Sequence, residues 1–479
     1  MKRTVYSVLH SDAYKYAMAQ AGFPLRLETF SLTFRHGGWQ YIPFDLEAEI
    51  RAMLDFGIEG LDYLAEHGYG LTPAMEAALD KDVTIKAAPK GTWVWEREPI
   101  VTVTGPSFLV SWLEPLVLRL SFAIQFATEV MKGTVTPDML VATCSEQEEI
   151  MRRVLKECGK NPDDPGYAVT LEDVEYAARV RKTVASLIHI VGSPERVFEV
   201  GMRAATCEEQ HMIALQAARE AGLTASSNVS LAQKLGQTPI GTMGHEHIQR
   251  WGNDLEAYRA MRDTRVGKPS YLLDTFDTAG SGIPAALQVM QEQPHEASIR
   301  YDSGDKYGQY MFAHGCFREA GIEVTHILED GLNLEMTQKF EHLREFTGVA
   351  PEKQVYGYGG FIVSKSMTNP LTRDRVSAVY KLTWSVGPRM KFGNETGLGK
   401  VSVPGNPETW RRLRGDGVLS MIGQAGERPP ENFIVLNGNP EAAAQIKLCN
   451  AGPPRNFDPQ PYTLSPETQK LVDELRKAS

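Results

Sequence analysis

A histidine follows two closely spaced glycines in the segment Gly241 to Glu246, and it stands out as a reactive side chain on a predicted turn. Apolar Pro239 and Ile240 precede the glycines, and residues 248–251 begin a helical pattern. His245 is therefore predicted on a strand-to-helix turn, where an imidazole can reach a ligand and titrates near neutral pH. The alternative is a histidine that only hydrogen-bonds or caps the turn, since a single motif is a weak signal.

A cation and carboxylates alternate in the segment Arg300 to Asp305. Arg300 and Asp302 are two residues apart on a predicted strand, so their side chains point the same way. The planar guanidinium of Arg300 can bind a phosphate or a carboxylate, and Asp302 can bind ribose hydroxyls or a magnesium ion. The alternative is an ion pair with a purely structural role.

Two further carboxylates, Asp274 and Asp277, follow the preceding apolar run. Carboxylates at the end of a strand suit a magnesium site better than a hydrophobic core. Asp277 alternatively caps the next helix, which is a common use of aspartate. Asp274, together with Asp302, is therefore the predicted metal ligand.

Two turns and one aromatic side chain complete the candidate chemistry. Glycines in the segment 357–360, including Gly359 and Gly360, let backbone N–H groups converge on a phosphate, although they can also be an ordinary turn. The acidic turn that ends at Gly331 is a candidate for binding ribose hydroxyls. Near the N-terminus, the flat ring of Tyr14 offers a stacking platform for an aromatic ligand, or else belongs to the core.

These side chains need a scaffold that brings strand ends together, and residues 195–387 repeat a strand, a turn and a helix. Parallel strands need such crossovers, and active sites of α/β barrels collect at the carboxyl ends of the strands. The pattern predicts a closed or nearly closed α/β barrel, with an open doubly wound sheet as the alternative. The predicted strands are Arg196 to Met202, Leu223 to Ser227, Thr238 to Thr242, Tyr271 to Thr275, Ser298 to Asp302, Glu323 to Leu328, Gln354 to Tyr358 and Val376 to Trp384.

The two ends of the chain have a different character. Residues 1–130 combine antiparallel strand patterns with helical stretches, which predicts a separate α+β domain. Residues 131–387 form the predicted barrel domain. Residues 388–479 return to short strands with Pro/Gly-rich turns, and they are expected to pack on the N-terminal domain and complete it.

Composition excludes several classes of function. The length of 479 residues predicts two or three domains, and 42% hydrophobic with 23% charged residues is typical of a soluble globular protein. A net charge of −10 argues against a nucleic-acid surface. No run of about 18 apolar residues that could span a bilayer occurs, and the start lacks a secretory core. We expect a cytoplasmic protein without membrane or nucleic-acid partners, whose five scattered cysteines are reduced.

The motifs in their order resemble those of the nicotinate phosphoribosyltransferase family, over most of residues 8–405. No single motif is decisive, but their order and spacing together are specific. The segments that carry the resemblance are Asp12 to Lys15, Gly201 to Arg203, Ser226 to Val229, Gly241 to Glu246, Arg300 to Asp305, Gly357 to Gly360 and Val379 to Leu382.

The resemblance implies a type II phosphoribosyltransferase with an N-terminal α/β domain, an irregular TIM-like barrel and a homodimer with shared active sites. Its substrates would be nicotinate and 5-phosphoribosyl 1-pyrophosphate, with Mg²⁺ and with ATP as cosubstrate. By this resemblance His245 is phosphorylated by ATP, whose hydrolysis drives formation of the mononucleotide. The other implied roles are phosphate and base binding for Arg203 and Arg300, ribose and metal binding for Asp274 and Asp302, phosphate binding for Gly359 and Gly360, and ring stacking for Tyr14 of the neighbouring subunit.

Three positions bear on the choice of base. Val200 stands where the family commonly has an aromatic residue, and Ala204 replaces a frequent second arginine, which permits weaker stacking or another base. Ser227 stands where relatives that use nicotinamide have an aspartate; a hydroxyl can donate to nicotinate, whereas a carboxylate repels it. Nicotinate is therefore the expected substrate. The alternatives are nicotinamide phosphoribosyltransferase and, from another class, a nucleotide-binding regulatory protein without catalysis.

Overall fold

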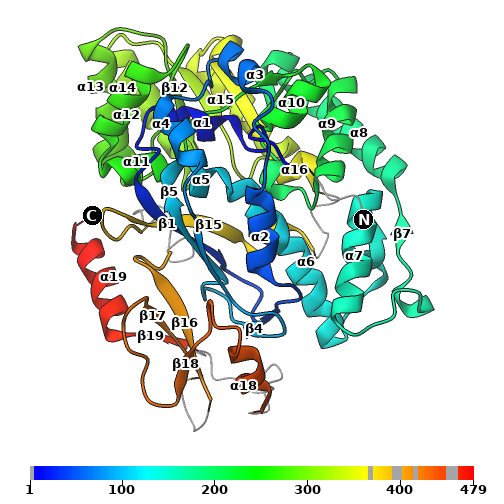
Figure 1. The fold of residues 1–479 in the computed structure, drawn as a ribbon. Helices are drawn as coiled ribbons and strands as arrows, with labels where there is room; N and C mark the ends of the chain where they lie inside the picture. The colour runs from blue at the N-terminus through cyan, green and yellow to red at the C-terminus, as the bar shows by residue number, and fades with distance from the viewer. Residues whose placement is uncertain (1–4, 365–370, 391–401, 414–418, 449–461, 479) are drawn as a thin grey trace.

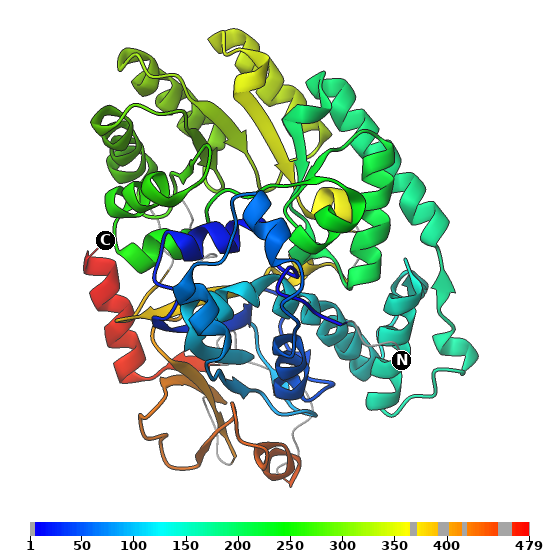
Figure 2. The ribbon, with the colours of Figure 1, turned by 45° about the horizontal axis from the view of Figure 1, so that its top comes forward.

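The computed structural model describes residues 5–364, 371–390, 402–413, 419–448 and 462–478. Seven short parallel strands form one curled sheet in the order β10-β9-β8-β14-β13-β12-β11. Helices connect successive strands and lie along the outside of the sheet (Figures 1 and 2). The strands are β8 (Val197–Glu199), β9 (Ala225–Ser226), β10 (Thr238–Pro239), β11 (Ser270–Leu272), β12 (Ser298–Tyr301), β13 (Thr325–Leu328) and β14 (Gln354–Tyr358).

The predicted βα units are confirmed, and the sheet is a curled half-barrel. β10 and β11 are its two edges, and within the described residues no strand pairing joins them. The carboxyl ends of all seven strands nevertheless face one side, as the prediction required. The connecting helices are α9 (Glu208–Glu220), α10 (Val229–Leu235), α11 (His245–Trp251), α12 (Asp254–Thr264), α13 (Ile283–Glu292), α14 (Lys306–Glu319), α15 (Leu334–Thr347) and α16 (Gly360–Val363).

The eighth predicted barrel strand, Val376 to Trp384, does not join this sheet. Residues Ala378–Ser385 form β15, which follows the short helix α17 (Arg373–Val376) and pairs antiparallel with β1 (Leu27–Phe34). An apolar run predicts a buried strand but carries no information on its partner, because parallel and antiparallel buried strands share that pattern. The correction matters for function, since β15 brings Lys381 from the N-terminal sheet to the site described below.

The N-terminal sheet is antiparallel, with the order β15-β1-β5-β3. Its other strands are β3 (Thr84–Ala87) and β5 (Val101–Pro106), and a two-stranded ribbon pairs β2 (Gln40–Tyr41) with β4 (Trp93–Val94). This confirms the antiparallel strands expected there. The helices of this part are α1 (Ala13–Gln20), α2 (Leu46–Leu54), α3 (Leu61–Glu66), α4 (Pro73–Leu79), α5 (Ser107–Trp112) and α6 (Glu114–Lys132).

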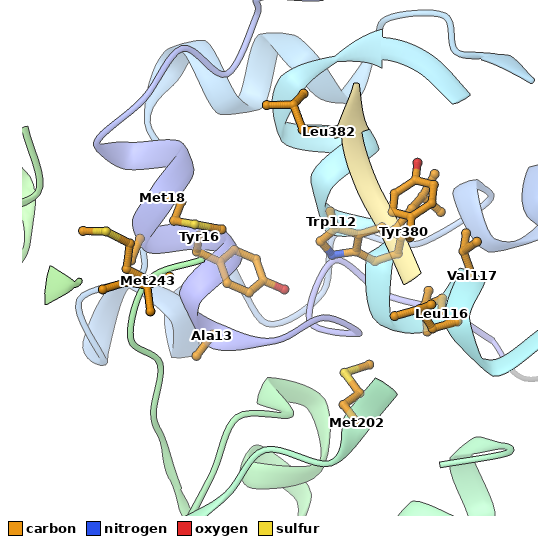
Figure 3. Close-up of a cluster of buried hydrophobic side chains, with 14 of the residues drawn as sticks. Ala13, Tyr16, Met18, Trp112, Leu116, Val117, Met202, Met243, Tyr380 and Leu382 are labelled. Carbon is orange, nitrogen blue, oxygen red and sulfur yellow. The ribbon is translucent and has the colours of Figure 1, made fainter. Parts of the chain in front are cut away.

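One buried cluster joins the N-terminal part to the loops of the parallel sheet (Figure 3). Tyr16 of α1 and Trp112 of α5 are fully buried in it, together with Met202 and Met243 from loops that follow β8 and β10. Each fully buried methionine contributes about 1.5–3 kcal/mol of hydrophobic stabilisation. These two methionines therefore fix the loops that carry Arg203 and His245.

Two further parts flank this arrangement. The helices α7 (Ser145–Glu157) and α8 (Asp173–Val191), with the short parallel strands β6 (Val141–Ala142) and β7 (Thr170–Leu171), connect α6 to β8. The C-terminal sheet has the order β18-β16-β17-β19. Its strands and helices are β16 (Pro407–Arg412), β17 (Ser420–Gln424), β18 (Phe433–Val435), α18 (Ala442–Leu448), β19 (Tyr462–Leu464) and α19 (Pro466–Ala478).

Polar contacts tie the C-terminal sheet to the N-terminal one. Arg411 pairs with Glu98 at 2.9 Å, and the side-chain amide of Asn437 donates to the carbonyl of Pro99 at 2.9 Å. Within the described ranges no helix is long and apolar enough to cross a membrane. The four described cysteines are free thiols, whereas Cys449 lies outside the described residues.

Candidate active site

Two adjoining cavities open at the carboxyl ends of the parallel strands. The inner cavity, between the strand ends and the N-terminal part of the chain, has about 670 Å³ of empty space when its opening to solvent is included. The outer cavity, above the glycine turns, has about 1470 Å³ of empty space on the same basis. Several residues line both cavities, so a ligand can extend from one into the other; they are Val200, Arg203, His245, Asp302, Glu329 and Lys381.

His245 lies between the two cavities, as the first residue of α11. Its Nδ1 lies 3.0 Å from the hydroxyl of Thr275, and its Nε2 lies 3.3 Å from Asp302 Oδ2 and 3.8 Å from Asp274 Oδ1. The imidazole is thus held by a hydroxyl on one side and by two carboxylates on the other. The predicted strand-to-helix turn is confirmed, and the ring of His245 contacts side chains that follow β11 and β12.

Arg300 lies deeper in the inner cavity and is held from four directions. Its guanidinium donates to Thr242 Oγ1 at 2.9 Å, to the Met243 carbonyl at 2.7 Å, and to the Asp302 carboxylate. Its Nε lies 3.1 Å from Glu329 Oε2. Burial alone lowers the pKa of Arg300, but Glu329 and Asp302 outweigh burial and raise it. The expected alignment of Arg300 with Asp302 is confirmed, and the arginine stays charged.

Glu329 is the counterion of Arg300, and its surroundings disfavour its own negative charge. Burial raises the pKa of Glu329, and the neighbouring Asp302 adds to this effect, while Arg300 and Arg203 oppose it. Its second oxygen, Oε1, is buried without a hydrogen-bond partner. A ligand that offers a donor, such as a hydroxyl, can satisfy this oxygen.

His245, Asp274 and Asp302 form a group that can hold a cation. One ligand atom from each lies within 4.8 Å of the others. Asp274 Oδ1 is buried without a hydrogen-bond partner, while its other oxygen accepts from Ser303 Oγ. An unpartnered buried carboxylate oxygen is costly unless it meets a positive charge. The two carboxylates fit Mg²⁺, which prefers oxygen ligands.

Asp277 takes the structural role that was its alternative. Its carboxylate accepts from the backbone N–H groups of Ala279 and Gly280 at the start of the turn Thr278–Gly282. It does not belong to either cavity. The preference for Asp274 over Asp277 as a site residue is consistent with this placement.

The N-terminal wall of the inner cavity is a buried network of charges around Glu114. Glu114 Oε2 accepts from the Tyr14 hydroxyl at 2.9 Å and pairs with Lys15 at 2.5 Å, and Lys15 also pairs with Glu246 at 2.9 Å. Burial works to raise the pKa of Glu114, but Lys15, Lys381 and Arg203 outweigh it and hold that pKa well below its usual range.

Tyr14 lines the inner cavity from the same chain. The resemblance implied that Tyr14 of the neighbouring subunit takes this place, and that expectation stays a prediction. The approach depends on Gly241, because a Cβ there would lie 2.3 Å from the backbone nitrogen of Tyr14. Arg203 lies across from Tyr14 and pairs weakly with Glu114 at 3.7 Å, so its guanidinium can still bind an anion.

Ser227 and Asp12 form a buried pair in the same cavity. The Ser227 hydroxyl donates to Asp12 Oδ1 at 2.5 Å, and the backbone N–H of Ala13 donates to the Ser227 carbonyl at 2.8 Å. Burial raises the pKa of Asp12, although Arg203 and the hydrogen bond from Ser227 oppose the shift. The hydroxyl that was expected to face the ligand therefore already has an acceptor.

The predicted glycine turns line the outer cavity. Gly359 and Gly360 begin α16, and Gly331 has a positive φ of 63° beside Asp330. Two arginines, Arg35 and Arg373, line the same cavity. The cavity therefore combines glycine backbone with positive charge, which suits a phosphate group.

The sequence prediction missed the N-terminal wall. Glu114, Lys15 and Glu246 were not among its candidates, although Glu114 is a lone carboxylate in the mostly apolar run 108–120. A charged residue in such a run is rarely buried without a partner, and that signal was available. Lys381 was placed on the wrong sheet, because the strand Val376 to Trp384 was assigned to the barrel.

Comparisons with known proteins point to one family. Residues 196–386 match the model of the nicotinate phosphoribosyltransferase (NAPRTase) family. The chain is 26% identical to the nicotinate phosphoribosyltransferase of Bos taurus over 405 residues, which cover 81% of this chain and 70% of that protein. It is 30% identical to the enzyme of Bacillus subtilis over 274 residues, which cover 56% of this chain and 51% of that protein.

Solved structures share the fold. A nicotinate phosphoribosyltransferase from Porphyromonas gingivalis superposes with a TM-score of 0.58 at 20% identity, covering 83% of this chain and 96% of that one. The corresponding protein from Vibrio cholerae gives a TM-score of 0.55 at 16% identity, covering 82% and 89%. The family match spans the parallel sheet and the strand-end residues His245, Arg300 and Asp302. Over residues 196–386 the chain is therefore similar to the nicotinate phosphoribosyltransferase family.

Proposed function

We propose that this protein is a nicotinate phosphoribosyltransferase, which forms nicotinate mononucleotide and pyrophosphate from nicotinate and 5-phosphoribosyl 1-pyrophosphate. The observation that carries the proposal is the pair of adjoining cavities that share Arg203, His245 and Asp302. The inner cavity has an aromatic wall and a cation for a small anionic ring, and the outer cavity has glycines and arginines for phosphates. The family match of residues 196–386 supports the same reaction.

Catalysis of this transfer depends on charge rather than on a strong nucleophile. Loss of pyrophosphate leaves positive charge on the ribose, so the site must stabilise the leaving group and hold the pyridine in line. In our proposal Arg203 and Tyr14 hold the base, and Arg300 keeps its charge next to the reacting groups. Glu329, whose Oε1 lacks a partner, accepts a ribose hydroxyl. Gly331, Gly359 and Gly360 bind phosphate oxygens.

We assign the metal to Asp274 and Asp302. Mg²⁺ bound there supplies positive charge for the pyrophosphate. The hydrogen bond from Ser303 to Asp274 orients that ligand, which is the usual role of groups around a metal site.

ATP coupling through His245 is the second part of the proposal. His245 accepts the γ-phosphoryl group of ATP on a ring nitrogen, ADP leaves, and water later removes the phosphoryl group. Asp302 and Asp274 flank Nε2 and can hold the proton that this nitrogen releases. A homodimer, and closure of the half-barrel into an irregular barrel, are further parts of the proposal.

The function is tested by pyrophosphate release from 5-phosphoribosyl 1-pyrophosphate with nicotinate and with nicotinamide, each with and without ATP and Mg²⁺. We expect release with nicotinate, stimulation by ATP and loss of release when Mg²⁺ is chelated. Turnover of nicotinamide alone would replace the nicotinate assignment by the nicotinamide one. Binding of nucleotides without any pyrophosphate release would instead favour a regulatory protein.

A further inference from the structure

We propose that Asp12 is a positioning residue that sets the direction of the Ser227 hydroxyl and thereby decides which pyridine substituent the inner cavity binds. The inference rests on the proposed function and deepens it. Nicotinate carries a carboxylate, which needs a donor, whereas nicotinamide carries an amide N–H that needs an acceptor. One hydroxyl can serve either need, depending on where its single hydrogen points.

The first observation is the unusual use of Asp12. It is the N-cap residue of α1, a position where aspartate normally accepts from the backbone of its own helix. Here its side chain makes no capping hydrogen bond. The carboxylate turns to Ser227 instead, and the bond of 2.5 Å is shorter than a typical O–H···O bond between neutral groups.

The second observation is that the pair is buried and lines the inner cavity. Asp12 is 2% exposed and Ser227 is 1% exposed, and both line the inner cavity. The backbone N–H of Ala13 donates to the Ser227 carbonyl, and Asp12 forms a β-bridge with Asn228. These backbone contacts hold the two residues side by side.

Two proton states of Asp12 give two opposite binding surfaces. When Asp12 is ionised, Ser227 must donate to it, and only the lone pairs of the Ser227 oxygen remain for a ligand. When Asp12 is neutral, its own hydroxyl donates to Ser227, and the Ser227 hydrogen becomes free to donate to a carboxylate. Nicotinate then binds together with one proton, which bonds to an Asp12 oxygen, whereas nicotinamide binds without one.

The charges around Asp12 are compatible with this proton uptake. Arg203, on the turn after β8, and Lys15, on α1, favour the ionised form, while Glu114, at the start of α6, opposes it. Burial is the largest influence and raises the pKa of Asp12. The Tyr14 phenol does not compete as an acid, because burial and Glu114 raise its pKa well above the usual value.

The sign of the pH dependence follows. A raised pKa means that the proton is held to higher pH than in a free aspartate, and nicotinate binding is lost as pH rises through that pKa. Above it, the affinity for nicotinate relative to nicotinamide falls about tenfold for each pH unit, since one proton is taken up with one base only. Steps that both bases share cancel in this ratio.

The test is the ratio of kcat/KM for nicotinate over kcat/KM for nicotinamide, measured on the full chain between about pH 6 and 9. We expect the parent ratio to fall with pH. In Asp12→Asn the amide N–H donates to Ser227 at every pH, so the ratio becomes constant and stays in favour of nicotinate. Ser227→Ala removes the hydroxyl and lowers the ratio at every pH. Calorimetry in two buffers of different ionisation enthalpy gives the proton count directly, one for nicotinate and none for nicotinamide.

Two control variants separate Asp12 from other buried acids. Asp254 is also buried, its pKa is raised to about 6 by burial, and it lies outside both cavities. Asp254→Asn should keep the parent slope. Glu329→Gln removes the other carboxyl group of the inner cavity whose pKa is raised, and this variant should also keep the parent slope. If the ratio in Asp12→Asn keeps the parent slope, or if the parent ratio does not change with pH, the inference alone is wrong. If the protein turns over neither nicotinate nor nicotinamide, the proposed function and the inference are both wrong.

Discussion

The imidazole of His245 is the residue whose surroundings decide most about mechanism. Its Nδ1 faces the hydroxyl of Thr275, and its Nε2 faces Asp302 and Asp274. A histidine that served only to cap a turn would bond to backbone groups of its own helix, whereas this ring lies against side chains of other elements. The three partners come from the ends of β11 and β12, so the parallel sheet positions the ring for a ligand.

We therefore expect His245→Ala to lose the stimulation of pyrophosphate release by ATP, while slow synthesis without ATP remains. The reason is that only the route through phosphate on the ring disappears, and the groups that stabilise the leaving pyrophosphate stay in place. His247→Gln is the matched control, because His247 lies on the same helix but is fully buried, with its Nε2 on the Ala257 carbonyl. The assignment is wrong if His245→Ala keeps full ATP stimulation.

Which residues gather at this site was largely predictable, and how they pair was not. Arg300 and Asp302 share a strand face, and strand ends of a parallel sheet meet on one side, so local sequence was sufficient for these residues. Asp12 and Ser227 are 215 residues apart, and no local pattern indicates that the Ser227 hydroxyl donates a hydrogen bond to the Asp12 carboxylate. Contacts of that kind depend on how separate elements pack.

At the scale of elements, two helix starts facing each other hold α7 against α9. The segments Thr143 to Gln147 and Thr206 to Gln210 both follow the pattern Thr-Cys-x-Glu-Gln. Glu209 accepts from the backbone N–H of Glu146 at 2.6 Å, and Glu146 accepts from that of Glu209 at 2.8 Å. Each helix start thus receives a carboxylate from the other helix, which its dipole favours.

Glu146→Ala and Glu209→Ala should each lower the free energy of unfolding by about 0.5–2 kcal/mol, the usual loss for a helix-start acceptor. The double variant should lose more than the sum of the two single losses, because each single change already removes the one repulsion between the two carboxylates, and the double change cannot remove it a second time. Urea unfolding of the three variants measures this. Glu149→Ala is the control on the exposed face of α7 and should stay within about 0.5 kcal/mol of the parent; an additive double variant would show that the carboxylates do not interact.

The elements themselves were mostly predictable from periodicity, and the error at Val376 to Trp384 shows the limit. Seven predicted strands lie in the parallel sheet, and the eighth pairs with β1, more than 340 residues earlier in the chain. The run Val379, Leu382 and neighbouring apolar residues correctly indicates burial. Its partner is set by how the chain returns to the N-terminal sheet, which a local window does not contain.

At the scale of the whole molecule, one chain supplies both walls of the inner cavity. Tyr14 and Glu114 come from the N-terminal part, Lys381 comes from β15 of the N-terminal sheet, and Arg203 and His245 come from the parallel-sheet part. The buried cluster of Figure 3 joins the same two parts. The arrangement differs from the shared sites that the resemblance implied, in which Tyr14 belongs to the neighbouring subunit.

A complementation experiment in mixed dimers distinguishes the two arrangements. Tyr14→Ala and His245→Ala each damage a different wall of the cavity, and both chains are co-expressed with different tags and isolated together. If each chain completes its own cavity, every cavity in the mixed sample keeps one damaged wall, and ATP-stimulated turnover stays at the average of the two single variants. If Tyr14 were supplied by a partner, mixed dimers would contain one cavity with both native residues, and activity would rise well above that average. We expect no rise, because Gly241 and the pairing of Asp12 with Ser227 hold Tyr14 of the same chain against the cavity.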